Sequence, residues 1–262
     1  MSSVATSIAA GVVAPDRYIS AVLERHAVRR ERAERAAAGL EPLVRGWAGQ
    51  HFLGQSLSGS FAKGTATALS TDVDVFISLE HSAGPTMKEV YWGLYQHCAQ
   101  QGLRPRAQNV SIRVEFEALK VDLVPGRKQP GDGGDHSLYR RKKDSWVQTN
   151  VARHVRLIAD SSRTAEIRAL KIWRERNFLD LPSFYLELAV LEALYKRPAA
   201  ALAENVLAAL AYLGQQFSHA RIVDPANSNN VISDDLGAEE KRVIEVAARK
   251  SLGMSSWERV LW

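Results

Sequence analysis

Four stretches in the first half of the chain have the hydrophobic pattern of β-strands. Phe52 to Leu57 is a short apolar run, and Thr71 to Leu79 is an extended run rich in β-branched residues. Residues 110–116 alternate between apolar and polar side chains, and Leu119 to Pro125 is again mostly apolar. The pattern therefore predicts a mixed sheet formed by residues 52–125.

Apolar residues at helical spacing surround these strands. Pro15-Asp16 has the pattern of a helix start, and the apolar stripe after it continues to Trp47, over one long helix or a helix pair. Thr86 is a candidate cap for another helix, whose buried side would carry Met87, Val90, Tyr91, Leu94 and Cys98. From Thr149 onward helical patterns follow one another, at residues 151–158, 164–178, 183–196, 199–217 and 239–252.

Polar and charged segments interrupt these patterns. Residues 126–145 are rich in glycine and basic side chains, and residues 222–231 contain Asp, Pro and several Asn. Both compositions are typical of loops, so we predict a mobile loop and a turn-rich loop, respectively. The charged residues 25–35 indicate a solvated helix face with intrahelical ion pairs, and an RNA-contacting surface is the alternative.

The succession of patterns predicts an α+β protein with two lobes. Residues 1–15 are expected to be a flexible leader, and residues 16–148 a lobe that contains an N-terminal helix and the mixed sheet. Residues 149–262 are expected to form an all-helical C-terminal lobe. A cleft between the two lobes is the expected place for an active site.

Composition narrows the classes of protein to consider. The chain has 262 residues, no long uncharged apolar run and a single cysteine. We therefore expect a soluble, cytoplasmic protein with no membrane partner, internal disulfide or thiolate zinc cluster. A net charge of +5 favours polyanionic partners such as nucleotides or RNA. This excess of positive charge is too small to establish nucleic-acid binding by itself.

A glycine–serine turn after the first strand carries the first chemical signal. The segment is Gly59-Ser60-Phe61-Ala62-Lys63-Gly64-Thr65, and its small residues can open a helix. Free backbone N–H groups at such a helix start and the Ser60 hydroxyl would face an anion. Because Gly59 has no side chain, the backbone can come close to that anion. The turn therefore predicts a phosphate-binding site.

Paired carboxylates follow the turn. Asp72 and Asp74 lie two residues apart on the next strand, so alternation places both on one face. Two carboxylates that face a phosphate repel each other unless a divalent cation lies between them, and Mg²⁺ or Mn²⁺ suits such oxygen ligands. The turn and the pair together predict metal-assisted phosphoryl transfer.

Asp122 is a third candidate carboxylate. It stands between Val121 and Leu123, and a lone carboxylate in an apolar strand is costly to bury unless it is paired or close to a metal. We expect Asp122 beside the first two aspartates. The alternative is a strand residue that faces the surface.

The helical half supplies further candidates. The apolar stripe of the helix at residues 164–178 leaves Lys171 and Arg174 off the stripe, where they could reach into a cleft. Ser183 is a natural N-cap for the next helix. A cation and a helix start could together clamp a triphosphate, and the alternative is a surface lysine and an ordinary cap.

The glycine–serine turn followed by Asp-x-Asp resembles the signature of the polymerase-beta-type nucleotidyltransferase superfamily. From about Asp16 to its C-terminus, the chain resembles the bacterial cGAS/DncV-like nucleotidyltransferases (CD-NTases) and the related oligoadenylate synthases. Archaeal-type CCA-adding tRNA nucleotidyltransferases are more distantly similar. The motifs that carry the resemblance are Gly59 to Thr65, Asp72 to Asp74, Val121 to Pro125, Thr149-Asn150, Leu170 to Trp173, Ser183 to Glu187 and Asp224 to Val231.

The resemblance implies a polymerase-beta-like catalytic lobe and a role for each candidate residue. Two Mg²⁺ or Mn²⁺ ions would be held by three catalytic residues, Asp72, Asp74 and Asp122. Asp122 would also help to remove the proton of the acceptor hydroxyl. Nucleotide contacts would come from Gly59, Ser60, Lys63, Thr65, Lys171, Ser183 and Phe184, the last by stacking on the donor base.

The implied function is to join NTPs, ATP among them, into a cyclic or linear oligonucleotide second messenger, with release of pyrophosphate. The alternative is a template-independent RNA or tRNA terminal nucleotidyltransferase of the CCA-adding kind. A third hypothesis, a nucleotide- or RNA-binding protein with a degenerate site, is disfavoured because all three aspartates are present. The sequence leaves open an RNA or protein activator, the bases used and the oligomeric state.

Overall fold

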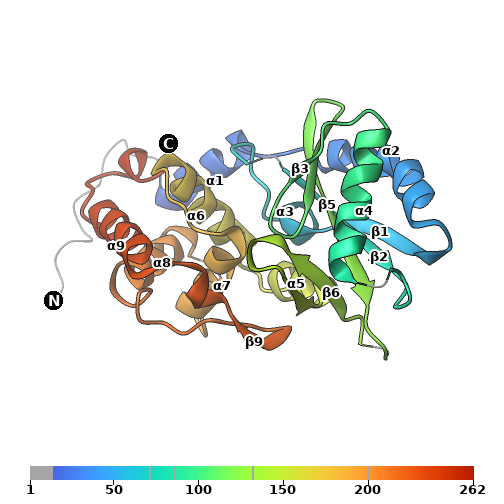
Figure 1. The fold of residues 1–262 in the computed structure, drawn as a ribbon. Helices are drawn as coiled ribbons and strands as arrows, with labels where there is room; N and C mark the ends of the chain where they lie inside the picture. The colour runs from blue at the N-terminus through green and yellow to red at the C-terminus, as the bar shows by residue number, and fades with distance from the viewer. Residues whose placement is uncertain (1–13, 71, 85, 132, 200) are drawn as a thin grey trace. The chain divides into compact units, whose positions relative to one another are not determined.

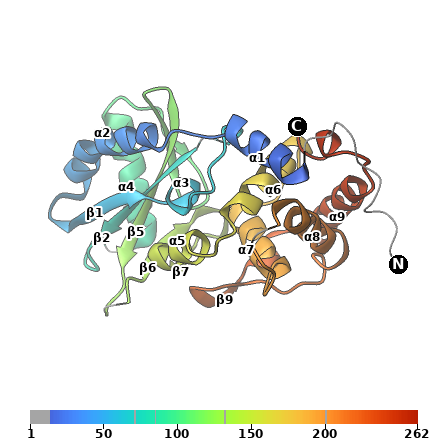
Figure 2. The ribbon, with the colours of Figure 1, turned by 180° about the vertical axis from the view of Figure 1, so that it is seen from behind.

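The computed structural model describes residues 14–70, 72–84, 86–131, 133–199 and 201–262 (Figures 1 and 2). This part of the chain divides into two compact units. The helical unit comprises residues 14–27, 165–220 and 236–262, and the sheet unit comprises residues 28–164 and 221–235. The expected leader lies, up to residue 13, outside the described residues. Among the described helices, none has the length and apolar character needed to cross a membrane.

A mixed sheet forms the centre of the sheet unit, as the sequence predicts. Its strands are β1 (Phe52–Leu57), β2 (Val73–Leu79), β3 (Arg106–Ala107), β4 (Ile112–Phe116), β5 (Leu119–Lys128), β6 (His136–Arg140) and β7 (Ser145–Thr149). The main path runs β1-β2-β5-β4-β3, in which β2 and β5 are parallel and the other neighbours antiparallel. β5 also pairs with β6, and β6 pairs with β7.

One face of this sheet is covered by α2 (Arg30–Ala48) and α4 (Met87–Gln100). β2 sends Val73, Val75, Ile77 and Leu79 into that core. Because side chains alternate along a strand, Asp74, Phe76 and Ser78 lie on the opposite face. The predicted stripe of α4 is confirmed: Met87, Val90, Tyr91, Leu94 and Cys98 are all buried, and Thr86 caps the helix by accepting the Glu89 N–H at 3.2 Å.

Two helices of the sheet unit lie on the side that carries Asp74. They are α3 (Gly59–Lys63), which follows β1, and α5 (Val151–Ala159), which follows β7. Both line a cavity with β1 and β2, which places them over the open face of the sheet. Short 3₁₀ turns at Gly49–His51, Arg141–Lys143 and Ile232–Asp235 complete the unit.

The helical unit consists of α1 (Pro15–Arg25), α6 (Thr164–Arg176), α7 (Ser183–Ala193), α8 (Leu202–Gln215) and α9 (Ala238–Leu252), with a 3₁₀ turn at Trp257–Arg259. The predicted start of α1 at Pro15 is confirmed. The sequence assigned α1 to the first lobe, whereas it packs with helices of the second half. The Tyr18 hydroxyl donates to Leu261 O at 2.7 Å, and Asp16 Oδ1 accepts the Ala203 N–H at 2.7 Å.

Two segments predicted as loops contain strands. Residues 126–145 hold the end of β5 and all of β6, and residues 222–231 form a hairpin of β8 (Val223–Asp224) and β9 (Asn227–Val231). The loop prediction was wrong because these strands form by backbone pairing, which their polar composition does not reveal. The second half is therefore not all-helical, and the β8–β9 hairpin belongs to the sheet unit.

Asp224 holds the β8–β9 hairpin in the sheet unit. Its buried carboxylate accepts hydrogen bonds from His154 Nε2 of α5 at 2.6 Å, from the Ala226 N–H at 2.8 Å and from Asn230 Nδ2 at 3.1 Å. Burial raises the pKa of Asp224, but the hydrogen bonds, that of His154 above all, oppose it, and the pKa is lowered from its ordinary value. Asp224 therefore stabilises the fold in its charged form.

Replacing Asp224→Asn is expected to lower the free energy of unfolding at neutral pH by roughly 1–3 kcal/mol, because it weakens a buried hydrogen-bonded network. Because the folded pKa is depressed, the carboxylate's contribution is complete above the unfolded pKa of about 4 and is lost as pH falls through the folded value. Urea unfolding should therefore show the gap between the two proteins shrinking below about pH 4. A gap that persists in acid would contradict this role. Asp160→Asn, at the exposed end of α5, is the control.

Candidate active site

The glycine–serine turn connects β1 to a very short helix. Ser58 is the N-cap of α3, and its backbone N–H donates to Asp74 O at 2.8 Å. α3 ends after one turn at Gly64, which takes the left-handed conformation with φ 72°. The Thr65 N–H then donates to Ser60 O at 2.9 Å. These bonds confirm the expected turn and helix start and tie the turn to the strand that carries Asp74.

Gly59 is needed at this turn for two reasons. Its φ of 54° lies in the left-handed region, which side chains with a Cβ adopt at a cost. A Cβ at this position would also overlap the Asp74 carboxylate, whose Oδ2 and Cγ occupy the space. The sequence explained Gly59 by close approach to a phosphate. In the structure, the group that approaches Gly59 is Asp74.

Asp74 and Asp122 lie side by side. They are register partners on the neighbouring parallel strands β2 and β5, so both side chains lie on the face opposite α2 and α4. Asp122 is 7% exposed and lies beside Asp74, and its role as the third catalytic carboxylate stays a prediction. Asp72 directly precedes β2. Asp74 and Asp122 therefore occupy neighbouring positions of β2 and β5, and their joint role with Asp72 as metal ligands stays a prediction.

Arg113 joins two of these carboxylates. It lies on β4 directly opposite Asp122 and donates to both of its oxygens, from Nε at 3.0 Å and from Nη2 at 2.7 Å. The same Nη2 lies 2.6 Å from Asp72 Oδ2. These bonds, to Asp122 first, raise the pKa of Arg113 well above its ordinary value, although burial opposes them. The guanidinium is therefore the cation that balances Asp72 and Asp122.

The sequence analysis did not single out Arg113. A signal was present, because residues 110–116 alternate and Arg113 occupies a polar position of that pattern. The sequence does not reveal the register of β4 against β5. This register places Arg113 opposite Asp122 and not opposite the residue two positions before or after it on β5.

The carboxylates of Asp72, Asp74 and Asp122 are chemically suited to bind divalent metal ions. Hard cations such as Mg²⁺ and Mn²⁺ bind carboxylate oxygens, and Arg113 already balances negative charge at this place. In the arrangement described, no three His, Cys, Asp or Glu side chains of the described residues are disposed to hold one ion. Metal binding would therefore require Asp72 or Asp122 to turn from Arg113 towards the ion.

The other candidates of the sheet unit lie close to the turn. Ser60 is half-buried, Lys63 is buried at the last residue of α3, and Thr65 is fully buried. Gly59, Ser60, Lys63 and Thr65 therefore share one short segment beside Asp74. Their nucleotide contacts stay predictions.

Lys171 lies elsewhere, in the core of the helical unit. Its Nζ is 2.6 Å from Glu187 Oε1 of α7, and the two side chains are 4% and 1% exposed. The sequence placed Lys171 and Arg174 outside the apolar stripe of α6, and this was wrong because both are buried. α6 has no solvent face over this stretch: Ile167, Ala169, Leu170, Ile172 and Trp173 are all 0% exposed. A single apolar stripe could not reveal a helix that is surrounded.

Ser183 is the first residue of α7 rather than its N-cap. Pro182 occupies the N-cap position, and no side chain caps the helix. The Ser183 hydroxyl instead accepts a hydrogen bond from Arg174 Nη1 at 2.9 Å, and the same nitrogen donates to Leu181 O at 2.8 Å. Phe184 follows and is half-buried. The roles of Lys171, Ser183 and Phe184 towards a nucleotide stay predictions.

Comparison with known proteins identifies solved structures that have a similar fold. No family model matches the sequence, and no curated protein matches it. Among solved structures, CdnC of E. coli MS115-1 with ATP has a TM-score of 0.73 and 19% sequence identity, and the match covers 89% of this chain and 88% of CdnC. The CD-NTase CdnG of Bradyrhizobium diazoefficiens with GTP has a TM-score of 0.74 and 12% identity, covering 91% and 90%. The chain has the fold of the CD-NTases.

Vibrio cholerae DncV, a cyclic AMP-GMP synthase described as a prokaryotic cGAS homolog, supports the same assignment. Its TM-score is 0.62 at 16% identity, and the match covers 91% of this chain and 80% of DncV. This confirms the predicted fold class. The chain combines a mixed sheet with a helical second part, as CD-NTases do. At this level of identity the likeness establishes the fold.

Gly59→Ala is expected to destabilise this CD-NTase fold by at least about 2 kcal/mol, because it adds a Cβ at positive φ and forces the Asp74 carboxylate to move. Gly49→Ala is a matched control: Gly49 has the same φ of 54°, but a Cβ there meets nothing within 4 Å. Urea unfolding measures the loss of stability in both variants. The difference between the two losses gives the effect of the overlap between the added Cβ and the Asp74 carboxylate, apart from backbone strain. Equal losses of stability would show that the approach of Asp74 to Gly59 has no energetic effect.

Arg113→Ala is expected to lower the free energy of unfolding by about 2 kcal/mol, because it leaves Asp72 and Asp122 without their shared cation. Millimolar Mg²⁺ should restore more stability to this variant than to the wild type, because an ion bound to the native state adds to its stability. Arg106→Ala, an exposed arginine opposite Arg113 on β3, is the control. Thermal unfolding with and without Mg²⁺ measures both effects. An equal Mg²⁺ effect on the two proteins would contradict a metal site at these carboxylates.

Proposed function

We propose that this chain is a metal-dependent nucleotidyltransferase that joins NTPs into a cyclic or linear oligonucleotide second messenger, with release of pyrophosphate. One observation carries the proposal. Asp74 and Asp122 are register partners on adjacent strands, and the glycine–serine turn closes against Asp74 at Gly59. A phosphate-binding turn and paired carboxylates at one place are what phosphoryl transfer with metal ions requires.

The solved structures with this fold support the class of substrate. CdnC is described with ATP and CdnG with GTP. DncV is described as a cyclic AMP-GMP synthase and also in complex with the linear intermediate 5′ pppA(3′,5′)pG. We therefore propose NTPs as substrates, with ATP among them, and a short linear nucleotide as the first product.

The proposed cofactor is two Mg²⁺ or Mn²⁺ ions, which when bound supply Lewis-acid stabilisation of the charge on the triphosphate and on the attacking oxygen. Asp72, Asp74 and Asp122 would hold them. Both oxygens of Asp122 accept N–H groups from Arg113. Each of these oxygens accepts one N–H and keeps a second lone pair, which could take the proton of an acceptor hydroxyl while Arg113 holds the carboxylate in place.

The turn and the helical unit would orient the nucleotide. The backbone at Gly59 and the Ser60 hydroxyl would contact the phosphates, with Lys63 and Thr65 behind them. Lys171 would reach a triphosphate only by emerging from the buried place that it shares with Glu187. Ser183 is exposed at the start of α7 and would be more directly accessible, and Phe184 beside it would stack on the base.

The proposal includes the cellular location and the binding partners of the enzyme. We propose a cytoplasmic protein whose partners are NTPs and an activator, which is an RNA or a protein. CdnC is also described in a complex with HORMA-deltaN, so a protein partner occurs for one chain of this fold.

Purified protein should convert NTPs labelled at the α-phosphate, with Mg²⁺ or Mn²⁺, into a small product that keeps its label after phosphatase treatment, because that label lies in the phosphodiester bonds of a linear or a cyclic product. Asp74→Asn, which keeps the shape beside Gly59, should reduce product formation by at least about 100-fold, since even the outer partners of metal ligands contribute 10–100-fold. Asp160→Asn is the control and should retain activity.

The same assay with tRNA separates the alternatives. Label on RNA alone would replace the proposed function by a terminal nucleotidyltransferase. Full activity of Asp74→Asn would remove the metal assignment. No product from any NTP mixture, with or without RNA, would favour the nucleotide- or RNA-binding protein with a degenerate site.

A further inference from the structure

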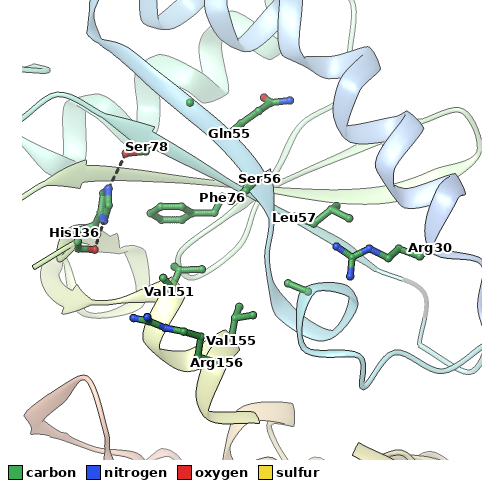
Figure 3. Close-up of a pocket in the computed structure, with 14 residues that line it drawn as sticks. Arg30, Gln55, Ser56, Leu57, Phe76, Ser78, His136, Val151, Val155 and Arg156 are labelled. Carbon is green, nitrogen blue, oxygen red and sulfur yellow. Dashed lines mark hydrogen bonds between the residues drawn. The ribbon is translucent and has the colours of Figure 1, made fainter. Parts of the chain in front are cut away.

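A cavity of about 630 Å³ opens on the face of the sheet opposite α2 and α4 (Figure 3). Residues of β1, β2, α3, α5 and β6 line it together with Arg30 at the start of α2, and all of these elements belong to the sheet unit. Small-molecule sites have volumes of roughly 300–1,000 Å³. None of the aspartates or nucleotide contacts assigned above is among its described lining residues. The cavity therefore adjoins the candidate active site at Ala62 of α3 but, over the described part of the chain, is lined by none of the residues assigned to that site.

The sheet presents mostly small side chains at the floor of the cavity. Gly54 of β1 pairs with Ser78 of β2, and Ser56 pairs with Phe76. The Phe76 ring borders this floor, and Val151 and Val155 of α5 lie on the other side of the cavity (Figure 3). The result is a slot with apolar walls, of a kind that suits a planar ring.

Ser78 offers a hydrogen-bond acceptor at the floor of this slot. Burial lowers the pKa of His136 from its ordinary value, so the ring is neutral at pH 7. His136 Nδ1 lies 2.9 Å from Gly134 O, and because a carbonyl only accepts, Nδ1 carries the proton. Nε2 must then accept the Ser78 hydroxyl proton, over 2.8 Å. The remaining lone pairs of Ser78 Oγ can receive an N–H or O–H from a ligand.

Two arginines give the cavity a positive rim. Arg156 of α5 is exposed, and within the described part of the chain its guanidinium forms no hydrogen bond or ion pair. Arg30 is anchored by Nε to Glu34 at 2.8 Å and by Nη1 to Phe61 O at 3.3 Å. The described lining residues include no carboxylate. An anionic group would therefore be attracted to this rim without repulsion from the lining.

We propose that this cavity binds a purine nucleoside monophosphate. The base lies in the slot with an amino or ring N–H donating to Ser78, and the phosphate lies against Arg156, while Arg30 adds to the positive charge of the rim. The ligand is an effector rather than a donor, because a monophosphate has no pyrophosphate to release. Phe76 lies two residues from Asp74 on the same face of β2, so an occupied cavity contacts the strand that carries a candidate metal ligand. This assignment goes beyond the proposed function.

Isothermal titration calorimetry with AMP and with GMP, in the absence of divalent metal, tests the proposal. At least one of the two is expected to bind with one site per chain. Gly54→Leu should abolish binding because its side chain fills the slot. Position 54 tolerates a side chain, since its φ is not positive and a Cβ there meets nothing within 4 Å. Thermal unfolding of this variant verifies that it is folded.

Arg156→Ala is a second variant that leaves the floor of the cavity intact. It should weaken binding by about tenfold or more, which is the effect of losing one charge-assisted phosphate contact. Arg153→Ala is the matched control, because Arg153 is exposed on the same helix but does not line the cavity. Its affinity for the nucleotide should equal that of the wild type.

Two results would overturn the proposal. One is the absence of binding of AMP and GMP to the wild type at millimolar concentration. The other is binding that survives in Gly54→Leu and disappears in Asp74→Asn, which would place the nucleotide at the candidate active site. The titration requires no catalysis, so a failure of the cavity proposal and a failure of the proposed function are distinguishable.

Discussion

The Arg113 guanidinium, held between Asp72 and Asp122, is the interaction on which the candidate site depends. Like charges on neighbouring strands repel each other, and burying Asp122 without a partner would be costly. Arg113 offsets this cost with three charge-assisted hydrogen bonds from one planar group. The sheet can therefore present its carboxylates in the absence of metal. The same bonds fix the orientation of Asp72 and Asp122 and leave each of the three oxygens a further lone pair.

The alternating side chains of strand β2 serve the hydrophobic core on one face of the sheet and the candidate site on the other. Val73, Val75, Ile77 and Leu79 anchor the strand in the core under α2 and α4, whereas Asp74 projects from the opposite face. Because the core side is packed, the strand cannot slip by one residue without burying a carboxylate and exposing valine. The position of the Asp74 carboxylate against Gly59 is thus fixed by hydrophobic packing on the other side of the sheet. The seven residues of β2 therefore contribute both to the hydrophobic core and to the candidate site.

Local patterns were sufficient for several elements because neighbouring residues decide them. β1 has the predicted bounds, Pro15 starts α1, and Thr86 caps α4. Elsewhere local patterns failed. The strands β6, β8 and β9 lie in segments of polar, turn-rich composition, and they form by backbone pairing with neighbouring strands, which that composition does not reveal. Lys171 lies inside the helical unit because α6 is surrounded by other helices, which its own periodicity does not reveal.

The sequence by itself determined the sheet-and-helix class, the glycine–serine turn and three candidate aspartates on neighbouring strands, because these follow from spacing and from the cost of isolated charges. Only the tertiary structure decided which groups meet. It placed Arg113 opposite Asp122, brought the Asp74 carboxylate to Gly59, and paired Lys171 with Glu187. These contacts depend on strand register and on packing between segments far apart in the chain, and no local pattern encodes either.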